Sequence, residues 1–240
     1  MSDILLTLAI AVIPIVLAIT LHEAAHGFVA LALGDDTARR AGRLSINPLR
    51  HVDRFGTIIL PGLLLVFQLL FPPHKVQFMF GWAKPVPVSA WKFRHPRQGM
   101  AVVAAAGPAM NFGLAWLAAL AMPRDWLDDA LSTHQLLSSF LFYFILSNLV
   151  LGLFNLIPIP PLDGGRIAVG LLPRPLALRW ARLERAGLLI IILAVFLLPS
   201  LLRPLGIAFD PVGEALNRVV PWAIDLVLRL AGHDAGELHV

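Results

Sequence analysis

The stretch LAITLHEAAHGF, residues 17–28, places two histidines and a glutamate inside an apolar run that extends from residue 4 to residue 33. On a helix, His22 and His26 are one turn apart, so both imidazoles project from one face and can bind one cation. Glu23 lies beside them, as suits a base that takes a proton from a metal-activated water molecule. Ionisable groups near the middle of a bilayer each cost roughly 2.5–3.5 kcal/mol, so their clustering indicates a functional site.

The composition indicates an integral membrane protein. The chain has 240 residues, of which 58% are hydrophobic and 14% charged, and its mean hydropathy is +0.78. This is more apolar surface than one soluble core can bury, so we expect the lipid bilayer as a partner. The net charge is +4, but the basic residues lie in loops between apolar runs, so no nucleic-acid partner is expected. Because the chain has no cysteine, any metal must be held by His, Asp or Glu.

Four apolar segments are long enough to cross roughly 30 Å of hydrocarbon. They lie at about residues 4–33, 100–122, 136–157 and 187–202. A run at 57–71 is short and contains Pro61, so it could cross the membrane or turn back within it. A run at 219–230 is interrupted by charges and predicts an interfacial amphipathic helix. We therefore predict an all-α polytopic membrane protein, a bundle of about 5–6 transmembrane helices, in which 57–90 could form an extended or re-entrant segment.

The arginines and lysines predict the orientation. Three loops, 35–54, 75–97 and 166–185, carry five basic residues each, whereas the loop that contains Asp125 and Asp129 is acidic. Basic loops favour the cytoplasm, so we expect those three inside and the N-terminus and the acidic loop outside. HEAAH then lies toward the cytoplasmic end of its span.

A second motif offers the third ligand that a catalytic zinc site needs. NLIPIPPLDGGR, residues 155–166, follows an apolar run, and Asp163 is its only acidic residue. Its three prolines prevent a regular helix and expose backbone carbonyls, which at membrane depth is tolerated only where the backbone lines a cavity or is buried. Its two adjacent glycines let the chain turn into the next element. Taken alone, the motif could equally be a surface turn.

The two motifs together resemble the site-2 protease family of intramembrane zinc metallopeptidases, peptidase family M50. HEAAH on an early span is followed far along the chain by N-x-x-P-x-P-P-L-D-G, and GRLSINP, GWAKPVPV and AAGPAMN fit as well. The resemblance covers about residues 15–170. It implies that one Zn²⁺ per chain is bound by His22, His26 and Asp163, and that Glu23 activates the attacking water molecule.

The resemblance also implies roles for two amides. Asn155 and Asn111 correspond to positions that hold an extended substrate or stabilise the oxyanion. The alternative for both is hydrogen bonding between helices, which is also the expectation for Asn148. Gly107 and Pro108 are expected to let their span pack closely against the first.

GWAKPVPV, residues 81–88, alternates valine with proline and predicts an extended edge segment. Such a segment could pair with an unfolded substrate strand, or it could anchor the chain at the membrane interface through Trp82 and Trp91.

The resemblance implies an enzyme that hydrolyses peptide bonds in or near transmembrane segments of membrane proteins, with a transmembrane protein as substrate. We expect one membrane-embedded metalloprotease domain over 1–240, with a catalytic core at about 4–172 and C-terminal helices at about 173–240. Many relatives carry a PDZ or CBS domain, but no stretch here fits either. The expected location is the bacterial inner membrane, with the active site toward the cytoplasm; the oligomeric state stays open.

Two other functions are compatible with the motifs. Intramembrane His and Asp also mark ion pathways, so the chain could be a metal-ion transporter. Transporters usually show internal repeats and polar residues along several spans, whereas here the ionisable groups gather at two motifs. A relative without catalysis could bind membrane helices, but it would have no reason to keep all four catalytic positions.

Overall fold

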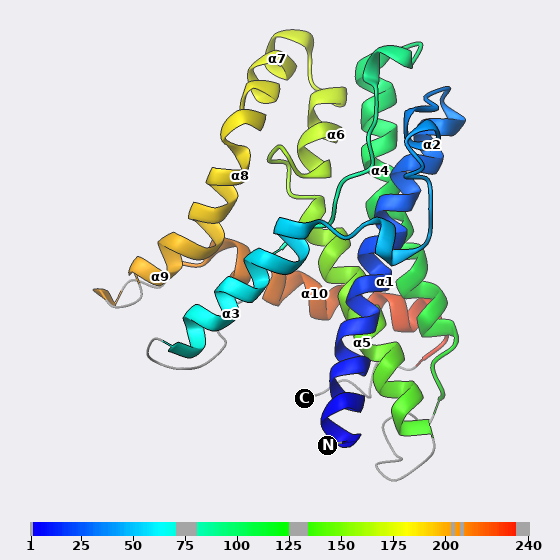
Figure 1. Cartoon of the computed structure of the whole chain (residues 1–240), viewed down its shortest axis with the longest axis vertical. Coiled ribbons are helices and arrows are strands. Elements are labelled where there is room, and N and C mark those ends of the chain that lie inside the picture. Colours follow the sequence, from blue (N-terminus) through cyan, green and yellow to red (C-terminus); the bar gives the residue numbers. More distant parts are fainter. Residues whose placement is uncertain (1, 71–80, 125–133, 203–204, 207–208, 234–240) are drawn as a thin grey trace.

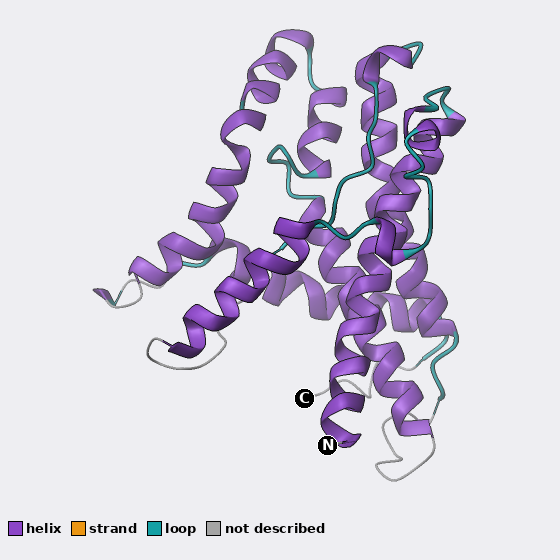
Figure 2. Cartoon of the chain, in the orientation of Figure 1, coloured by secondary structure: helices purple, strands orange, loops and turns teal. Residues whose placement is uncertain are grey.

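The computed structural model describes residues 2–70, 81–124, 134–202, 205–206 and 209–233 (Figure 1). Its α-helices are α1 (Ser2–Ala32), α2 (Thr37–Arg40), α3 (Leu60–Leu70), α4 (Pro96–Leu120), α5 (His134–Asn155), α6 (Asp163–Leu171), α7 (Arg174–Arg182), α8 (Glu184–Ile192), α9 (Leu198–Leu202) and α10 (Pro211–Leu230). No β-strand occurs among the described residues (Figure 2), as the all-α prediction requires.

The centre of the molecule is a three-helix bundle. Helices α1 and α5 run in one direction and α4 runs in the other between the same two ends (Figure 1). The segments Val12–Ala32, Pro96–Leu120 and Gln135–Asn155 are long and apolar enough to cross a membrane. Three of the four expected spans are thereby confirmed as candidate spans. The contact surface of α4 is built from small residues such as Ala104 and Ala115, which let the helix backbones approach closely.

The fourth expected span, 187–202, is helical but not regular. It consists of α8, a π-helical segment (Leu193–Leu197) and α9, and it runs apart from the bundle (Figure 1). Helix α3 follows another π-helical segment (Arg54–Ile59) and also leads away from the bundle. Residues 71–80 lie outside the described part of the chain, so whether 57–83 crosses the membrane stays open, and a span at 187–202 stays a prediction.

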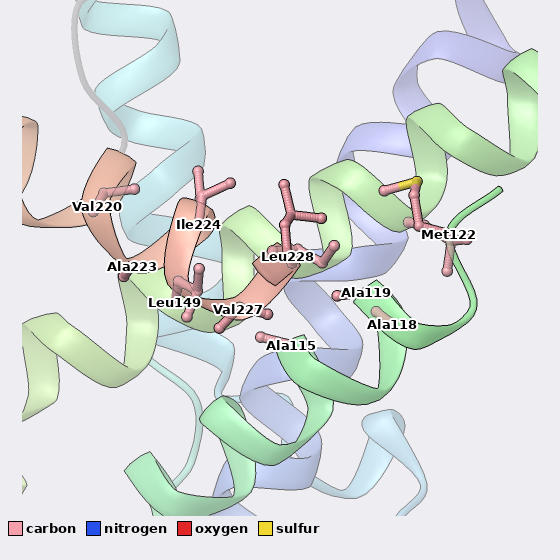
Figure 3. Packing of buried hydrophobic residues seen from close by; sticks show 12 residues of the cluster. Ala115, Ala118, Ala119, Met122, Leu149, Val220, Ala223, Ile224, Val227 and Leu228 are labelled. Carbon is pink, nitrogen blue, oxygen red and sulfur yellow. The ribbon is translucent and has the colours of Figure 1, made fainter. Parts of the chain in front are cut away.

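Helix α10 packs across α4 and α5 (Figure 3). Its buried residues recur at helical spacing and form one apolar face: Val220, Ala223, Ile224, Val227 and Leu228. They meet Ala115 and Ala119 of α4 and Leu149 of α5. The amphipathic helix expected at 219–230 is therefore present, and its apolar face contacts protein. Just beyond it, His233 is buried and its Nε2 donates to the Ala119 carbonyl, 2.9 Å away.

The ends of the bundle agree with the expected sidedness of the loops. Helix α2 and the α6–α7 connection lie at one end of the molecule, whereas the N-terminus and the close of α4 lie at the other (Figure 1). The loop 41–53 runs from the α2 end back along α1, where Leu44 lies beside Gly27. The basic residues of α2 and α7 thus share one end. Residues 125–133 of the acidic loop lie outside the described part, and which end faces the cytoplasm stays a prediction.

Candidate metal centre

The three predicted ligands meet at one point between α1 and α6. The His22 and His26 rings lie edge to face, with centroids 4.6 Å apart and an interplanar angle of 89°. Asp163, the first residue of α6, places Oδ2 3.1 Å from His22 Nε2 and 3.3 Å from His26 Nε2. One ligand atom from each residue lies within 4.8 Å of the other two. We call His22, His26 and Asp163 the metal trio.

The loop 156–162 carries Asp163 to the histidines, and glycines let it pack closely. A Cβ on Gly164 or Gly165 would collide with the backbone of residues 156–160, so only glycine fits in this first turn of α6. The prolines leave some carbonyls of this loop without a helical partner. The Pro158 carbonyl is one of them, and it accepts a hydrogen bond of 2.8 Å from Trp180 Nε1 on α7. The glycines were expected to allow a turn; what they allow is close backbone contact.

Helix α4 closes one side of the trio because Gly107 has no side chain. An added Cβ there would lie 2.5 Å from His22 Cε1 and 2.6 Å from His26 Cε1, which is too short for any real contact. Gly107 and Pro108 are both buried. The close packing expected at this point of the span is confirmed.

Asn111 and Asn148 form a directional relay behind His22. Asn148 Nδ2 donates to the Phe144 carbonyl at 2.8 Å, so its Oδ1 accepts from Asn111 Nδ2, also at 2.8 Å. Asn111 Oδ1 is thereby turned toward His22 Nδ1, 2.6 Å away, which must be the donor. Both amides are fully buried. The relay holds the His22 proton on Nδ1 and leaves the Nε2 lone pair for the trio.

His26 is oriented in the same way by the backbone. Its Nδ1 lies 2.7 Å from the Val103 carbonyl, which can only accept, so Nδ1 carries the proton and Nε2 points toward Asp163. Metal-binding histidines commonly donate their other ring N–H to such a partner, which fixes the tautomer and the ring plane.

The trio has the donor set of a cation site. Asp163 Oδ2 is buried without a hydrogen-bond partner, and it faces two imidazole lone pairs, so the three groups repel one another unless a cation lies between them. Ligand atoms at zinc–ligand distances of about 2.0–2.1 Å on a tetrahedron are about 3.3 Å apart. The two spacings from Asp163 Oδ2, 3.1 and 3.3 Å, fit that arrangement, and three protein ligands are the number that a catalytic zinc site uses.

The other predicted site residues do not belong to the trio. Glu23 is half-buried, and its Oε2 accepts a hydrogen bond of 3.0 Å from the backbone N–H of Val86. Asn155, at the end of α5, donates to the Leu151 carbonyl of its own helix at 3.0 Å. Asn111 contacts a ligand, His22, and its Nδ2 also lies 3.4 Å from the Ala18 carbonyl.

Comparisons with known proteins identify the family of this chain. Residues 120–198 match the profile of peptidase family M50. "Putative zinc metalloprotease YwhC" of Bacillus subtilis is 39% identical over 191 residues, which cover 78% of this chain and 80% of that protein. The chain belongs to peptidase family M50. This is the site-2 protease type of zinc metalloprotease that the two motifs indicated, so the protein is an enzyme of that family.

In two more distant relatives, the match covers a smaller share of the relative's length. "Putative zinc metalloprotease Rip2" of Mycolicibacterium smegmatis is 32% identical over 149 residues, which cover 62% of this chain and 51% of the relative. The protein of the same name from Mycobacterium tuberculosis H37Rv is 30% identical over 181 residues, 75% of this chain and 64% of the relative. No solved structure matches the chain significantly.

Proposed function

We propose that this M50 protein is an intramembrane zinc protease that hydrolyses peptide bonds in or near transmembrane segments of other membrane proteins. The observation that carries the proposal is the depth of the metal trio. His22 lies inside the candidate span Val12–Ala32, and Asp163 reaches it from a loop that follows the candidate span Gln135–Asn155. A site at that depth is placed to meet a substrate helix within the bilayer.

The proposed chemistry divides between ligands and a base. A zinc ion held by the trio would act as a Lewis acid toward both the scissile carbonyl and the attacking water molecule. Glu23 is next to a ligand but outside the trio, so its carboxylate accepts a proton from the attacking water and later delivers it to the departing amine. Asn155 remains the proposed contact to the substrate backbone or oxyanion. Asn111 is bonded to His22 and Asn148, so we assign it to holding His22.

The proposed location rests on the distribution of basic residues. We place the protein in the bacterial inner membrane with the trio opening toward the cytoplasmic side, because the basic residues of α2 and α7 share one end of the molecule. A bound substrate helix must unwind locally, because peptide bonds inside an intact helix are shielded.

Replacing Glu23 with Gln tests the proposal. The substitution keeps the size of the side chain and removes its basicity, so the variant is expected to stay folded and to hold zinc while peptide cleavage falls by at least roughly 100-fold. Zinc content by elemental analysis and cleavage of a model membrane peptide are measured on one preparation. Wild-type cleavage by Glu23→Gln protein would contradict the assigned base. Loss of zinc would mean that Glu23 is a ligand.

The rival function is a metal-ion transporter. Zinc uptake into vesicles that contain the protein separates the two, because transport needs the ligands and not a proton acceptor beside them. A transporter would carry zinc in both the wild-type and the Glu23→Gln form; the proposed protease carries none.

A further inference from the structure

A segment without regular secondary structure passes beside Glu23. Residues 81–89, here called the strap, connect the α3 region to α4 (Figure 2). The strap N–H groups of Trp82 and Lys84 donate to the carbonyls of Gly56 (3.1 Å) and His51 (2.8 Å). Alternate residues of the strap therefore bond to the same side, as in an extended chain. The expectation that GWAKPVPV is extended stays a prediction, but these N–H groups bind the protein itself.

The next N–H in this alternation, that of Val86, bonds to Glu23. Val86 is buried, its N–H donates to Glu23 Oε2 at 3.0 Å, and its side chain lies over Gly27, one turn further along α1. A Cβ on Gly27 would lie 3.1 Å from Val86 Cγ1, so glycine leaves the room that Val86 uses. The strap thus docks on the turn of α1 that carries the proposed base.

The far end of the strap is anchored by Asp35. This carboxylate is fully buried; its Oδ2 accepts from the Ser89 N–H at 2.6 Å, and its Oδ1 lies 3.2 Å from Lys92 Nζ. Its Oδ1 also accepts from the Thr37 N–H at 3.0 Å. Burial acts to raise the Asp35 pKa, but hydrogen bonds from Thr37, Ser89 and Lys92 outweigh it and hold the pKa below its ordinary value. Asp35 is therefore ionised at neutral pH.

Asp35 is held by a backbone hydrogen bond to the last turn of α1. The Asp35 N–H donates to the Ala30 carbonyl at 2.8 Å, so the carboxylate is fixed relative to the last turn of the helix that carries Glu23. Only two residues separate Ser89, at the anchor, from Val86, at the base. A shift of the strap at Ser89 must move the Val86 N–H as well.

From these contacts we infer that Asp35 is a positioning residue for Glu23, acting through the strap. The Val86 N–H holds Oε2 and leaves Oε1 to accept the proton, which removes torsional freedom from a side chain that must be placed accurately. The inference rests on the proposed protease function, because it assigns Asp35 to the base of that reaction. It concerns the rate of the chemical step and not the binding of metal.

The first test uses full-length Asp35→Ala protein. Zinc content should stay at the wild-type level, because the trio is intact, while kcat falls roughly 10- to 100-fold, as misplacement of a reacting group does; KM should change little. The matched control is His233→Ala, which also removes a buried polar anchor but lies beyond α10, away from the strap. That control should keep the wild-type kcat per folded molecule.

A second readout needs no activity. The chain has no cysteine, so Val86→Cys introduces a single thiol whose side chain is buried while the strap is docked. A water-soluble maleimide should label it several-fold faster when Asp35→Ala is added. Equal labelling rates would show that Asp35 does not hold the strap, and would overturn the inference whatever the activity.

A disulfide can replace the anchor. The hydroxyls of Thr37 and Ser89 are 3.1 Å apart, so this pair is the one to replace with cysteines for a cross-link between the strap and the start of α2. When the disulfide is formed in Asp35→Ala protein, most of the wild-type kcat should return. When the disulfide is reduced, kcat should fall back to the value of Asp35→Ala alone. An oxidised protein with kcat as low as Asp35→Ala alone would contradict the role of the strap.

A double variant separates this inference from the proposed function. Adding Asp35→Ala to Glu23→Gln should lower the residual rate no further, since both changes act on one group. A further tenfold drop would mean that Asp35 acts independently of Glu23. If wild-type protein shows no zinc-dependent cleavage, the proposed function fails; if Glu23→Gln is inactive and Asp35→Ala cleaves like wild type, only this inference fails.

Discussion

On the α4 side of the metal trio, the imidazoles are held by acceptors inside packed helices, whereas on the strap side Glu23 is held by one N–H of a segment without regular structure. His22 bonds to Asn111 and His26 to the Val103 carbonyl, both on α4. Glu23 depends on Val86, whose position depends in turn on Asp35. We therefore expect the helices to determine metal affinity and the strap to determine the rate of the proposed proton transfer.

The largest effect is expected on the helical side, at Asp163. Asp163→Ala leaves a two-histidine site without the negative ligand, so zinc should be lost on dialysis against a mild chelator and cleavage should fall below detection. Asp225→Ala, which breaks only the α10 pair with Arg229, is the control. Full zinc occupancy in Asp163→Ala protein would show that the third ligand has been misassigned.

A smaller effect on the same side is expected at Asn111. Asn111→Ala removes the acceptor that holds the His22 tautomer, and loss of such a partner typically weakens metal affinity 10- to 100-fold. Competition with a fluorescent zinc chelator measures the affinity. If zinc affinity stays unchanged while KM for a membrane peptide rises, Asn111 contacts substrate, as the sequence resemblance first implied.

On the strap side, Gly27→Val should lower kcat and leave zinc binding alone. A Cβ at this position already approaches Leu44 and Val86 at 3.0 and 3.1 Å, so a larger side chain must displace the strap. We expect a loss of roughly 3- to 10-fold in kcat at full zinc content. Gly113→Val on α4, where a Cβ would meet nothing within 4 Å, is the matched control and should keep the wild-type kcat.

The smallest expected effect is the pH dependence of the strap anchor. The pKa of Asp35 is below its ordinary value of 3.8 in the folded protein, so its stabilising contribution is present above the ordinary pKa and is lost as pH falls through the folded-state pKa. The difference in thermal unfolding between wild type and Asp35→Asn should therefore be constant from about pH 5 to 8 and narrow only below the ordinary pKa. A difference that disappears near neutral pH would contradict an ionised anchor.

The histidine pair was predictable because its chemistry is local: two histidines one helical turn apart define a face. Asp163 was a candidate as the only acid in a proline-rich loop, but its place in the ligand set was implied by the family resemblance, since the loop alone could equally be a surface turn. The relay through Asn148 was not predicted, since its meaning depends on which helix faces which. Asn148 could be foreseen as a hydrogen-bonding residue between helices, but its partner Asn111 and the link to His22 arise only from packing.

The strap anchor could not have been found from sequence. Asp35 follows the end of an apolar run and has the pattern of an ordinary charged loop residue; its burial depends on Ser89 and Lys92, which come from a segment far along the chain. The alternation in GWAKPVPV predicts an extended segment, but not its partner, Glu23. The packing of α10 against α4 and α5 could not be predicted either. The amphipathic pattern predicts that the helix has an apolar face, but not which surface that face contacts.

Zinc-dependent cleavage in a bilayer is the most direct test of the central claim. Wild-type protein and a single-span model substrate are reconstituted into liposomes, zinc is removed with a chelator and then returned, and mass spectrometry locates each cut. Cuts are expected to lie within or at the edge of the substrate's membrane span, to stop when zinc is removed and to resume when it returns. Cleavage that persists without zinc, or cuts confined to the soluble tails of the substrate, would contradict it.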